Sequence, residues 1–166
     1  EWARSTLSPF RHDDFRRFYL AQSLSLMGTW AHDLARAWII VEMMGKSSAL
    51  GSMLLAAAIP GLIFTLHGGA FVDRFNVRKI MMATKAGLAF TSLLLACFVE
   101  FENIQLWHFL VYAIIEGSIV AFDSPTFQTL IVRMVPRADF QQAIALNSLN
   151  FHAARMLGPI IAGTLM

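Results

Sequence analysis

The sequence predicts an all-α, polytopic transmembrane helix bundle, and three features carry that prediction. Of the 166 residues, 57% are hydrophobic and 14% are charged, whereas a soluble domain carries about 25% charged residues. Basic residues gather in alternate breaks between apolar segments. The five apolar segments span about 15–44, 49–72, 78–100, 105–132 and 140–166. An unusually apolar soluble helical bundle is the alternative.

Each segment reaches the ~20 residues that a helix needs to cross the hydrocarbon core of a bilayer. The runs are too long for ordinary strands and do not alternate, and lipid offers the backbone no hydrogen-bond partners, so helices are expected. Residues 45–48 read as a helix end followed by a cap, and Asn76 is expected to cap the third helix. Asp139, with Gln142 three residues later, resembles a capping box for the fifth.

The distribution of basic residues predicts the orientation of the helices. Residues 1–14 form an N-terminal arm ahead of the bundle at 15–166, and basic residues gather in and just after this arm, in the second break and in the fourth. They are Arg4, Arg11, Arg16, Arg17, Arg74, Arg78, Lys79, Arg133 and Arg137. The first break has only Lys46, and the third has Glu100 and Glu102. Because basic residues stay on the cytoplasmic side, the arm and these two breaks are expected in the cytoplasm.

The break between the second and third segments carries a motif. It reads Gly69-Ala-Phe-Val-Asp73-Arg74-Phe-Asn-Val-Arg78-Lys79 and resembles the G-x-x-x-D-R-x-x-x-R-[RK] signature of the major facilitator superfamily. Gly69 allows another helix to approach closely, and Asp73 and Arg74 can bond helix ends at the membrane surface. We expect these residues to form a conformational latch. An ordinary basic stop-transfer loop is the alternative.

Further segments are similar to one branch of this superfamily, the drug and siderophore exporters of the enterobactin-exporter type. They are residues 28–30, 121–125, 135–139, 143–148 and 155–159. The resemblance implies twelve helices in two halves, of which this chain is the first five, so the C-terminal half is missing. It also implies a bacterial inner (plasma) membrane, a proton gradient as energy source and no cofactor.

The end of the chain favours export over import. Gly158-Pro159-Ile-Ile-Ala162-Gly163 resembles the helix-five element of proton-coupled antiporters, with Ala162 in place of a glycine. The family's helix-four arginine is absent, because Ala113 stands four residues before Gly117. Proton coupling through that arginine is therefore not carried over.

Charged residues inside the spans are the candidate transport residues. Counting at ~1.5 Å per residue places Asp33, Glu116 and Arg155 in one layer near the membrane midplane, where transporters of this architecture bind substrate. We expect these three and Arg36 to line the substrate and proton pathway, with Asp33 or Glu116 taking up a proton. Structural ion pairs, Asp33 with Arg36 or Glu116 with Arg155, are the alternative.

A second feature of the fourth segment is Asp123-Ser124-Pro125. Proline disfavours helical geometry in the residue before it, so a kink or break is expected here, with Ser124 capping a new helix. Asp123 would hold that kink, meet Arg74 and Arg78, or touch substrate.

The sequence thus predicts a secondary active, proton-coupled exporter of small amphipathic compounds, drugs or siderophores. Its expected partners are the lipid bilayer and a small-molecule substrate, without nucleic acid. A facilitator-type importer or uniporter, and a non-transporting scaffold, remain alternatives. No polar helix stripe or selectivity loop for a channel is apparent, and no nucleophile elbow, phosphate loop or His cluster indicates an enzyme or a metal site.

Overall fold

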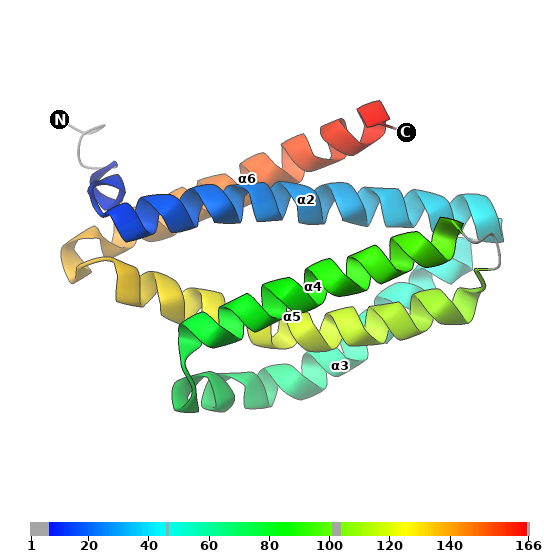
Figure 1. Ribbon diagram of the computed structural model, residues 1–166, viewed down its shortest axis with the longest axis horizontal. Coiled ribbons are helices and arrows are strands. Elements are labelled where there is room, and N and C mark those ends of the chain that lie inside the picture. The colour runs from blue at the N-terminus through cyan, green and yellow to red at the C-terminus, as the bar shows by residue number, and fades with distance from the viewer. Residues whose placement is uncertain (1–6, 46, 101–103, 166) are drawn as a thin grey trace. The chain divides into compact units, whose positions relative to one another are not determined.

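The computed structural model describes residues 7–45, 47–100 and 104–165, apart from the side chains of 47, 65–71, 73 and 165. The described residues form five long helices and no strand, which confirms the all-α prediction (Figure 1). The helices are α2 (Asp13–Met44), α3 (Ser47–Arg74), α4 (Val77–Glu100), α5 (Leu106–Met134) and α6 (Phe140–Leu165), with 3-10 turns η1 (Ser8–Arg11) and η2 (Arg137–Asp139).

The chain divides into two compact units. The first unit comprises Glu1–Trp38 and Ile131–Met166, and the second comprises Ile39–Leu130. The two divisions fall within α2 and α5. The first unit therefore pairs most of α2 with α6, and the second contains α3, α4 and most of α5.

Two helix ends follow the local chemistry that the sequence predicts. Gly45 has φ of +60°, and its N–H donates to the Val41 carbonyl at 3.0 Å, so the glycine ends α2 in the left-handed region. The Asn76 side-chain oxygen accepts hydrogen bonds from the backbone N–H groups of Arg78 at 3.0 Å and Lys79 at 3.4 Å. The prediction that Asn76 caps the third long helix after it, α4, is confirmed.

The predicted capping box at Asp139 is wrong. Asp139 lies in η2, where its carboxylate accepts a hydrogen bond from the Ser8 hydroxyl at 2.5 Å and lies 3.2 Å from His12 Nε2. The Gln142 side-chain oxygen is buried without a hydrogen-bond partner among the described residues. The carboxylate oxygens are engaged by the N-terminal segment, so they are not aimed at the first turn of α6.

In the first unit α2 and α6 run in the same direction. The Tyr19 hydroxyl donates to the Leu146 carbonyl at 3.2 Å, and further along both helices Gly158 approaches Met27 and Trp30. At the start of the unit, Phe10 of η1 makes edge-to-face contacts with the rings of Phe15 and Tyr19. The N-terminal segment from Ser8 onward is thus packed against the helices that follow it.

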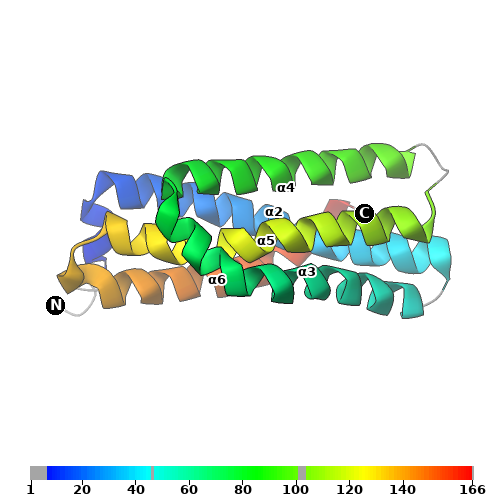
Figure 2. The ribbon, with the colours of Figure 1, turned by 90° about the horizontal axis from the view of Figure 1, so that it is seen from below.

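In the second unit α3 and α5 are parallel and α4 runs antiparallel beside α5 (Figure 2). Gly117 of α5 meets Ala57 of α3, and Phe122 lies against Phe64. One end of this unit holds a shared apolar core. Its buried members are Ile40, Ala49, Met53, Leu95, Ile104, Phe109, Tyr112 and Ala113.

Large apolar side chains cover the outside of the helices. Examples are Leu24 and Leu62, each 74% exposed, and Met156, 69% exposed. Within the described residues, α4 and α5 are long and apolar enough to cross a membrane, with mean hydropathies of 1.7 and 1.4 over their best windows, and a shorter apolar helix covers Ser48–Phe64. Most residues in the two long windows are not buried, so this apolar surface suits lipid rather than water.

Candidate transport site

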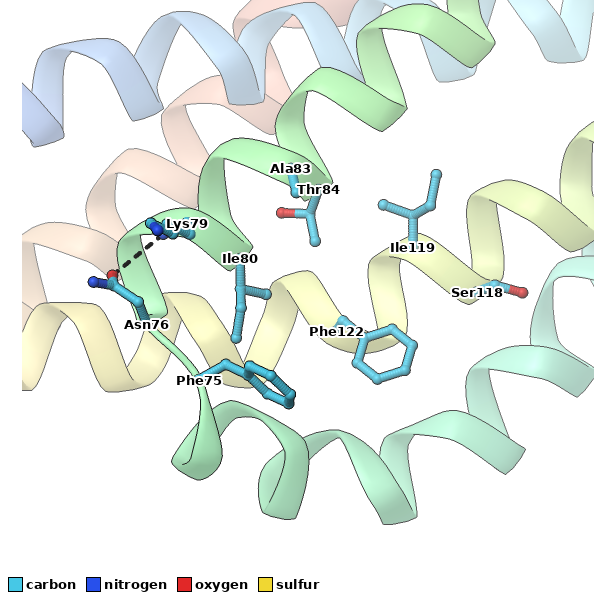
Figure 3. Close-up of a pocket in the computed structure, with 9 residues that line it drawn as sticks. All are labelled: Phe75, Asn76, Lys79, Ile80, Ala83, Thr84, Ser118, Ile119 and Phe122. Atoms are coloured by element: carbon cyan, nitrogen blue, oxygen red, sulfur yellow. Dashed lines mark hydrogen bonds between the residues drawn. The ribbon is translucent and has the colours of Figure 1, made fainter.

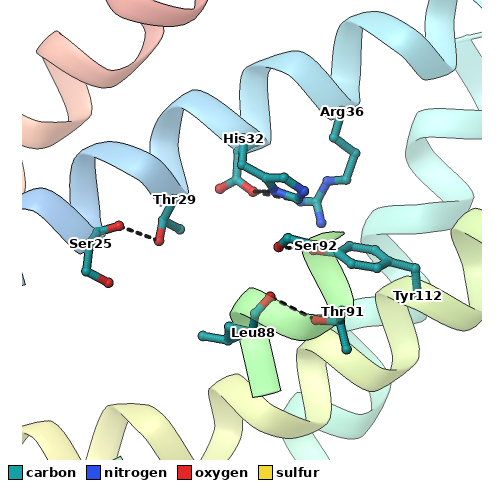
Figure 4. Close-up of polar contacts among 9 residues, drawn as sticks. Ser25, Thr29, His32, Arg36, Leu88, Thr91, Ser92 and Tyr112 are labelled. Atoms are coloured by element: carbon teal, nitrogen blue, oxygen red, sulfur yellow. Dashed lines mark hydrogen bonds and ion pairs between the residues drawn. The ribbon is translucent and has the colours of Figure 1, made fainter. Parts of the chain in front are cut away.

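A polar face runs along α2 in the first unit. Ser25, Thr29, His32 and Arg36 are spaced by four, three and four residues, which places them on one side of a helix. Figure 4 shows them projecting from α2, where the Thr29 hydroxyl donates to the Ser25 carbonyl at 3.0 Å. No polar stripe was predicted from the sequence, so this face corrects that prediction. Single serine and threonine residues do little to lower the hydropathy of an apolar segment. They are recognised as one face only when positions are compared at helical spacing.

Asp33 lies beside this polar face and supplies a negative charge next to Arg36. The Arg36 guanidinium donates to the Asp33 carboxylate at 2.9 Å, and His32 Nδ1 lies 3.9 Å from the same oxygen. The Arg36 side chain is 12% exposed and that of Asp33 is 35% exposed. The ion pair that the sequence offered as the structural alternative is therefore present, and about a third of the Asp33 side chain stays exposed.

Arg155 of α6 lies against an aromatic pair. Its guanidinium carbon is 5.5 Å from the centroid of the Trp30 ring, a cation–π distance. Trp30 makes an edge-to-face contact with Phe151, and Phe151 makes another with His152. Trp30 lies one turn before Asp33 on α2, so Arg155 and Asp33 belong to the same stretch of the first unit.

Gly158 sets the separation of α2 and α6. A Cβ at this position would lie 2.6 Å from Trp30 Cβ and 2.8 Å from the Met27 carbonyl oxygen, so only glycine fits. Gly163 has nothing within 4 Å of such a Cβ, and Pro159 lies inside a continuous helix. Of the antiporter-like motif, Gly158 is thus the residue that fixes helix packing within the unit.

Glu116 belongs to the second unit, on α5, and its convergence with Asp33 and Arg155 stays a prediction. It is half-buried and directly precedes Gly117. A Cβ on Gly117 would lie 2.2 Å from the Ala57 carbonyl oxygen, so α3 and α5 touch here through backbone. The position of Glu116 on α5 is therefore fixed by one of the tightest contacts in its unit.

Asp123 has partners that the sequence analysis missed. Its carboxylate accepts hydrogen bonds from the Thr84 hydroxyl at 2.7 Å and from the Lys85 ammonium at 2.9 Å, both on α4. The side chains of Lys85 and Asp123 are 29% and 15% exposed. Lys85 is the only charged residue between positions 80 and 99 of the sequence, and that isolation was the available signal.

Helix α5 continues through Ser124 and Pro125 without a break. Pro125 has no N–H to donate to the preceding turn of the helix. Two threonine hydroxyls near it donate to backbone carbonyls of the same helix. Thr126 donates to the Phe122 carbonyl at 2.6 Å, and Thr129 donates to the Pro125 carbonyl at 2.9 Å. Ser124 therefore caps no new helix, and the kink at Asp123 and Pro125 stays a prediction.

The expected latch lies at the α3–α4 junction. The side chains of Gly69 and Asp73 are outside the described part of the chain, whereas Arg74, Arg78 and Lys79 are exposed there. Beside them is a pocket of about 550 Å³, shown in Figure 3. It is lined by Phe75, Asn76, Lys79, Ile80, Ala83, Thr84, Ser118, Ile119 and Phe122. The junction thus combines exposed basic side chains with an apolar pocket between α4 and α5.

A family model described as "Transmembrane secretion effector" matches residues 4–166. The chain belongs to this family of the major facilitator superfamily. This is a family of membrane transporters, and the chain is accordingly part of an integral membrane protein.

Two curated relatives agree with this assignment. The chain is 21% identical over 150 residues to the "Staphyloferrin A transporter" of Staphylococcus aureus, covering 90% of the chain and 38% of that protein. It is 26% identical over 147 residues to the "Uncharacterized MFS-type transporter YfiS" of Bacillus subtilis, covering 88% of the chain and 34% of that protein. The chain thus spans little more than a third of either relative. No solved structure matches.

Proposed function

We propose that this chain forms part of a proton-coupled exporter of small amphipathic compounds, such as drugs or siderophores. The Asp33–Arg36 pair on the polar face of α2 is the observation that carries the proposal. Charged side chains within a membrane span are costly and tend to line water-filled pathways. A carboxylate held by one guanidinium can take up a proton and release that partner, which is what exchange requires.

The exchange would run through Asp33 as follows. A proton entering from the outside binds the Asp33 carboxylate and neutralises it, so the ion pair between Asp33 and Arg36 opens. When the pathway next opens to the cytoplasm, the proton leaves and the ion pair reforms. Glu116 is the second candidate for the same role, because it is half-buried in a span.

Export is supported by the family description, which names a secretion effector. A small-molecule substrate is supported by the relative named for staphyloferrin A. The polar face of α2 and the aromatic side chains of Trp30 and Phe151 offer both polar and apolar contacts to an amphipathic compound. These features favour an exporter over a scaffold without transport.

We further propose that the protein lies in the bacterial plasma membrane with the N-terminus in the cytoplasm. The basic residues at the α3–α4 and α5–α6 junctions support this orientation. Single cysteines introduced at Arg78 and Gln105, in a Cys97→Ser background, would test it. Labelling of intact cells by a membrane-impermeant maleimide should occur at 105 and not at 78, and the reverse pattern would contradict the orientation.

The proposed function is tested by efflux from cells that express the full-length transporter. A panel of dyes and drugs is loaded, and loss is followed with and without a protonophore. Protonophore-sensitive efflux that disappears in Asp33→Asn, in protein that still reaches the membrane, is the expected result. Efflux that ignores the gradient, or substrate uptake in its place, would point to the facilitator-type importer or uniporter.

A further inference from the structure

Within its membrane-spanning parts, the first unit has two positively charged side chains and one negatively charged side chain. Between residue 18 and residue 38 of α2, and throughout α6, the ionised side chains are Asp33, Arg36 and Arg155. Asp33 and Arg36 pair at 2.9 Å. Within the described residues of this unit Arg155 has no carboxylate partner, and its contact is with the Trp30 ring.

A guanidinium that lacks a carboxylate partner among the described residues of its own unit favours an anionic ligand at this depth. Arg155 lies fifteen residues beyond Phe140, the first residue of α6, which is about 22 Å along a helix axis. A charge this far inside a span is retained where it faces a partner or an aqueous cavity. The Trp30 face supports one side of the guanidinium, and a stacked guanidinium keeps its planar N–H donors for a carboxylate.

Apolar surface lies next to those donors. Phe151 is 40% exposed and meets Trp30 edge to face, and Gly158 holds Trp30 at a fixed separation from α6. A compound that bonds its anionic group to Arg155 would therefore rest its body on an aromatic wall. Both parts of the arrangement are set by contacts within one unit.

We propose that Arg155, Trp30 and Phe151 form a subsite for the carboxylate group of small organic anions. This inference rests on the proposed function and narrows its substrate class to compounds that carry a carboxylate beside an apolar or aromatic body. Arg155 bonds the carboxylate, Trp30 orients the guanidinium, and Phe151 contacts the body. Asp33 lies one turn from Trp30, so a proton on Asp33 lowers the negative charge that the anion meets.

Binding to the purified full-length transporter tests the subsite. The probes are 1-naphthoate and 1-naphthamide, which share one ring system and differ in charge. Calorimetry should show naphthoate binding more tightly than naphthamide. Arg155→Gln should weaken naphthoate binding about tenfold or more, as the loss of a charge-assisted bond requires, and should leave naphthamide binding nearly unchanged. Arg155→Lys should keep part of the preference, and Arg133→Gln is the matched control.

Three results would overturn the subsite. They are no measurable naphthoate binding by the unmodified protein, equal binding of the two probes, and weakening of both probes alike by Arg155→Gln. Recovery of naphthoate binding when Glu116→Gln is added to Arg155→Gln would also overturn it, since Glu116 would then be the partner of Arg155. Efflux assays separate the two proposals. Protonophore-sensitive efflux without anion preference would support the exporter and exclude the subsite. Arg155-dependent binding with gradient-independent efflux would support the subsite and exclude proton coupling.

Discussion

Both units hold their helices together across a stripe of small buried side chains with a glycine at its centre. In the first unit the stripe is Ala154, Gly158 and Ala162 on α6, and in the second it is Ala113, Gly117 and Ala121 on α5. Spacing of four residues places each stripe on one helix face, where small residues allow close packing in lipid. The two units thus pack their helices through the same kind of small-residue stripe.

The units differ in how they use charge. In the second unit the oppositely charged Lys85 and Asp123 join α4 to α5, with Thr84 as a further donor. In the first unit Asp33 and Arg36 lie on a single helix, and Arg155 lies against a ring. A pair between helices ties the fold together, whereas a pair within one helix can open without separating helices. On the proposed function, the Lys85–Asp123 pair serves the fold of the second unit and the Asp33–Arg36 pair serves transport.

The largest expected effect is on the pair between helices. Lys85→Met leaves the Asp123 carboxylate without its cation. Breaking a fully buried pair costs on the order of 3–5 kcal/mol, and this partly buried pair should lose a smaller share of that. The melting temperature of the purified protein should fall steeply. Lys85→Met combined with Asp123→Met should recover much of that loss.

The matched variant in the first unit is Arg36→Met. Because Asp33 is 35% exposed and lies on the same helix as Arg36, water can replace the lost partner and the melting temperature should fall less than in Lys85→Met. Equal losses in the two units would contradict the division of roles.

The next effect tests the shared framework. Gly117→Ala and Gly158→Ala insert a methyl group into backbone contacts, and overpacking of this kind costs about 1–3 kcal/mol. Gly51→Ala and Gly28→Ala are matched controls, because nothing lies within 4 Å of a Cβ there. The melting temperature should fall in Gly117→Ala and Gly158→Ala and stay nearly unchanged in the two controls. An unchanged melting temperature in Gly158→Ala would show that the α2–α6 contact is loose.

The smallest effect concerns the N-terminal segment. The Ser8 hydroxyl, followed by His12, hydrogen-bonds the Asp139 carboxylate and lowers the pKa of that carboxyl below its usual value. A lowered pKa means that the anchoring contribution is present above the ordinary carboxyl range and is lost as pH falls through the lowered value. Protease cleavage near Ser8 should therefore increase on acidification. The Asp139→Asn variant should be cleaved there readily even at neutral pH. Unchanged cleavage in this variant would show that the anchor lies elsewhere.

The all-helical fold followed from the sequence because bilayer thickness sets the length of apolar segments, and because Gly45 and Asn76 act on their own neighbours. The error at Asp139 has a different origin. Its partner Ser8 is 131 residues away, and sequence spacing cannot show which competing donor a carboxylate will take.

The candidate site was predictable in part. The pair of Asp33 with Arg36 lies within one helix turn, so its spacing revealed it. Lys85 with Asp123, and Arg155 with Trp30, each join two helices, and their contacts depend on how those helices rotate against each other. Charge in a span marks such residues as special, but packing decides whether they serve the fold or the pathway.

Efflux driven by an imposed pH gradient in proteoliposomes that contain the full-length transporter tests the role of Asp33 most directly. Asp33→Asn should abolish the response to the gradient while the protein stays folded. Lys85→Met with Asp123→Met should keep the response. Gradient-driven efflux that survives in Asp33→Asn and disappears in the double variant would contradict the assignment of transport to the first unit.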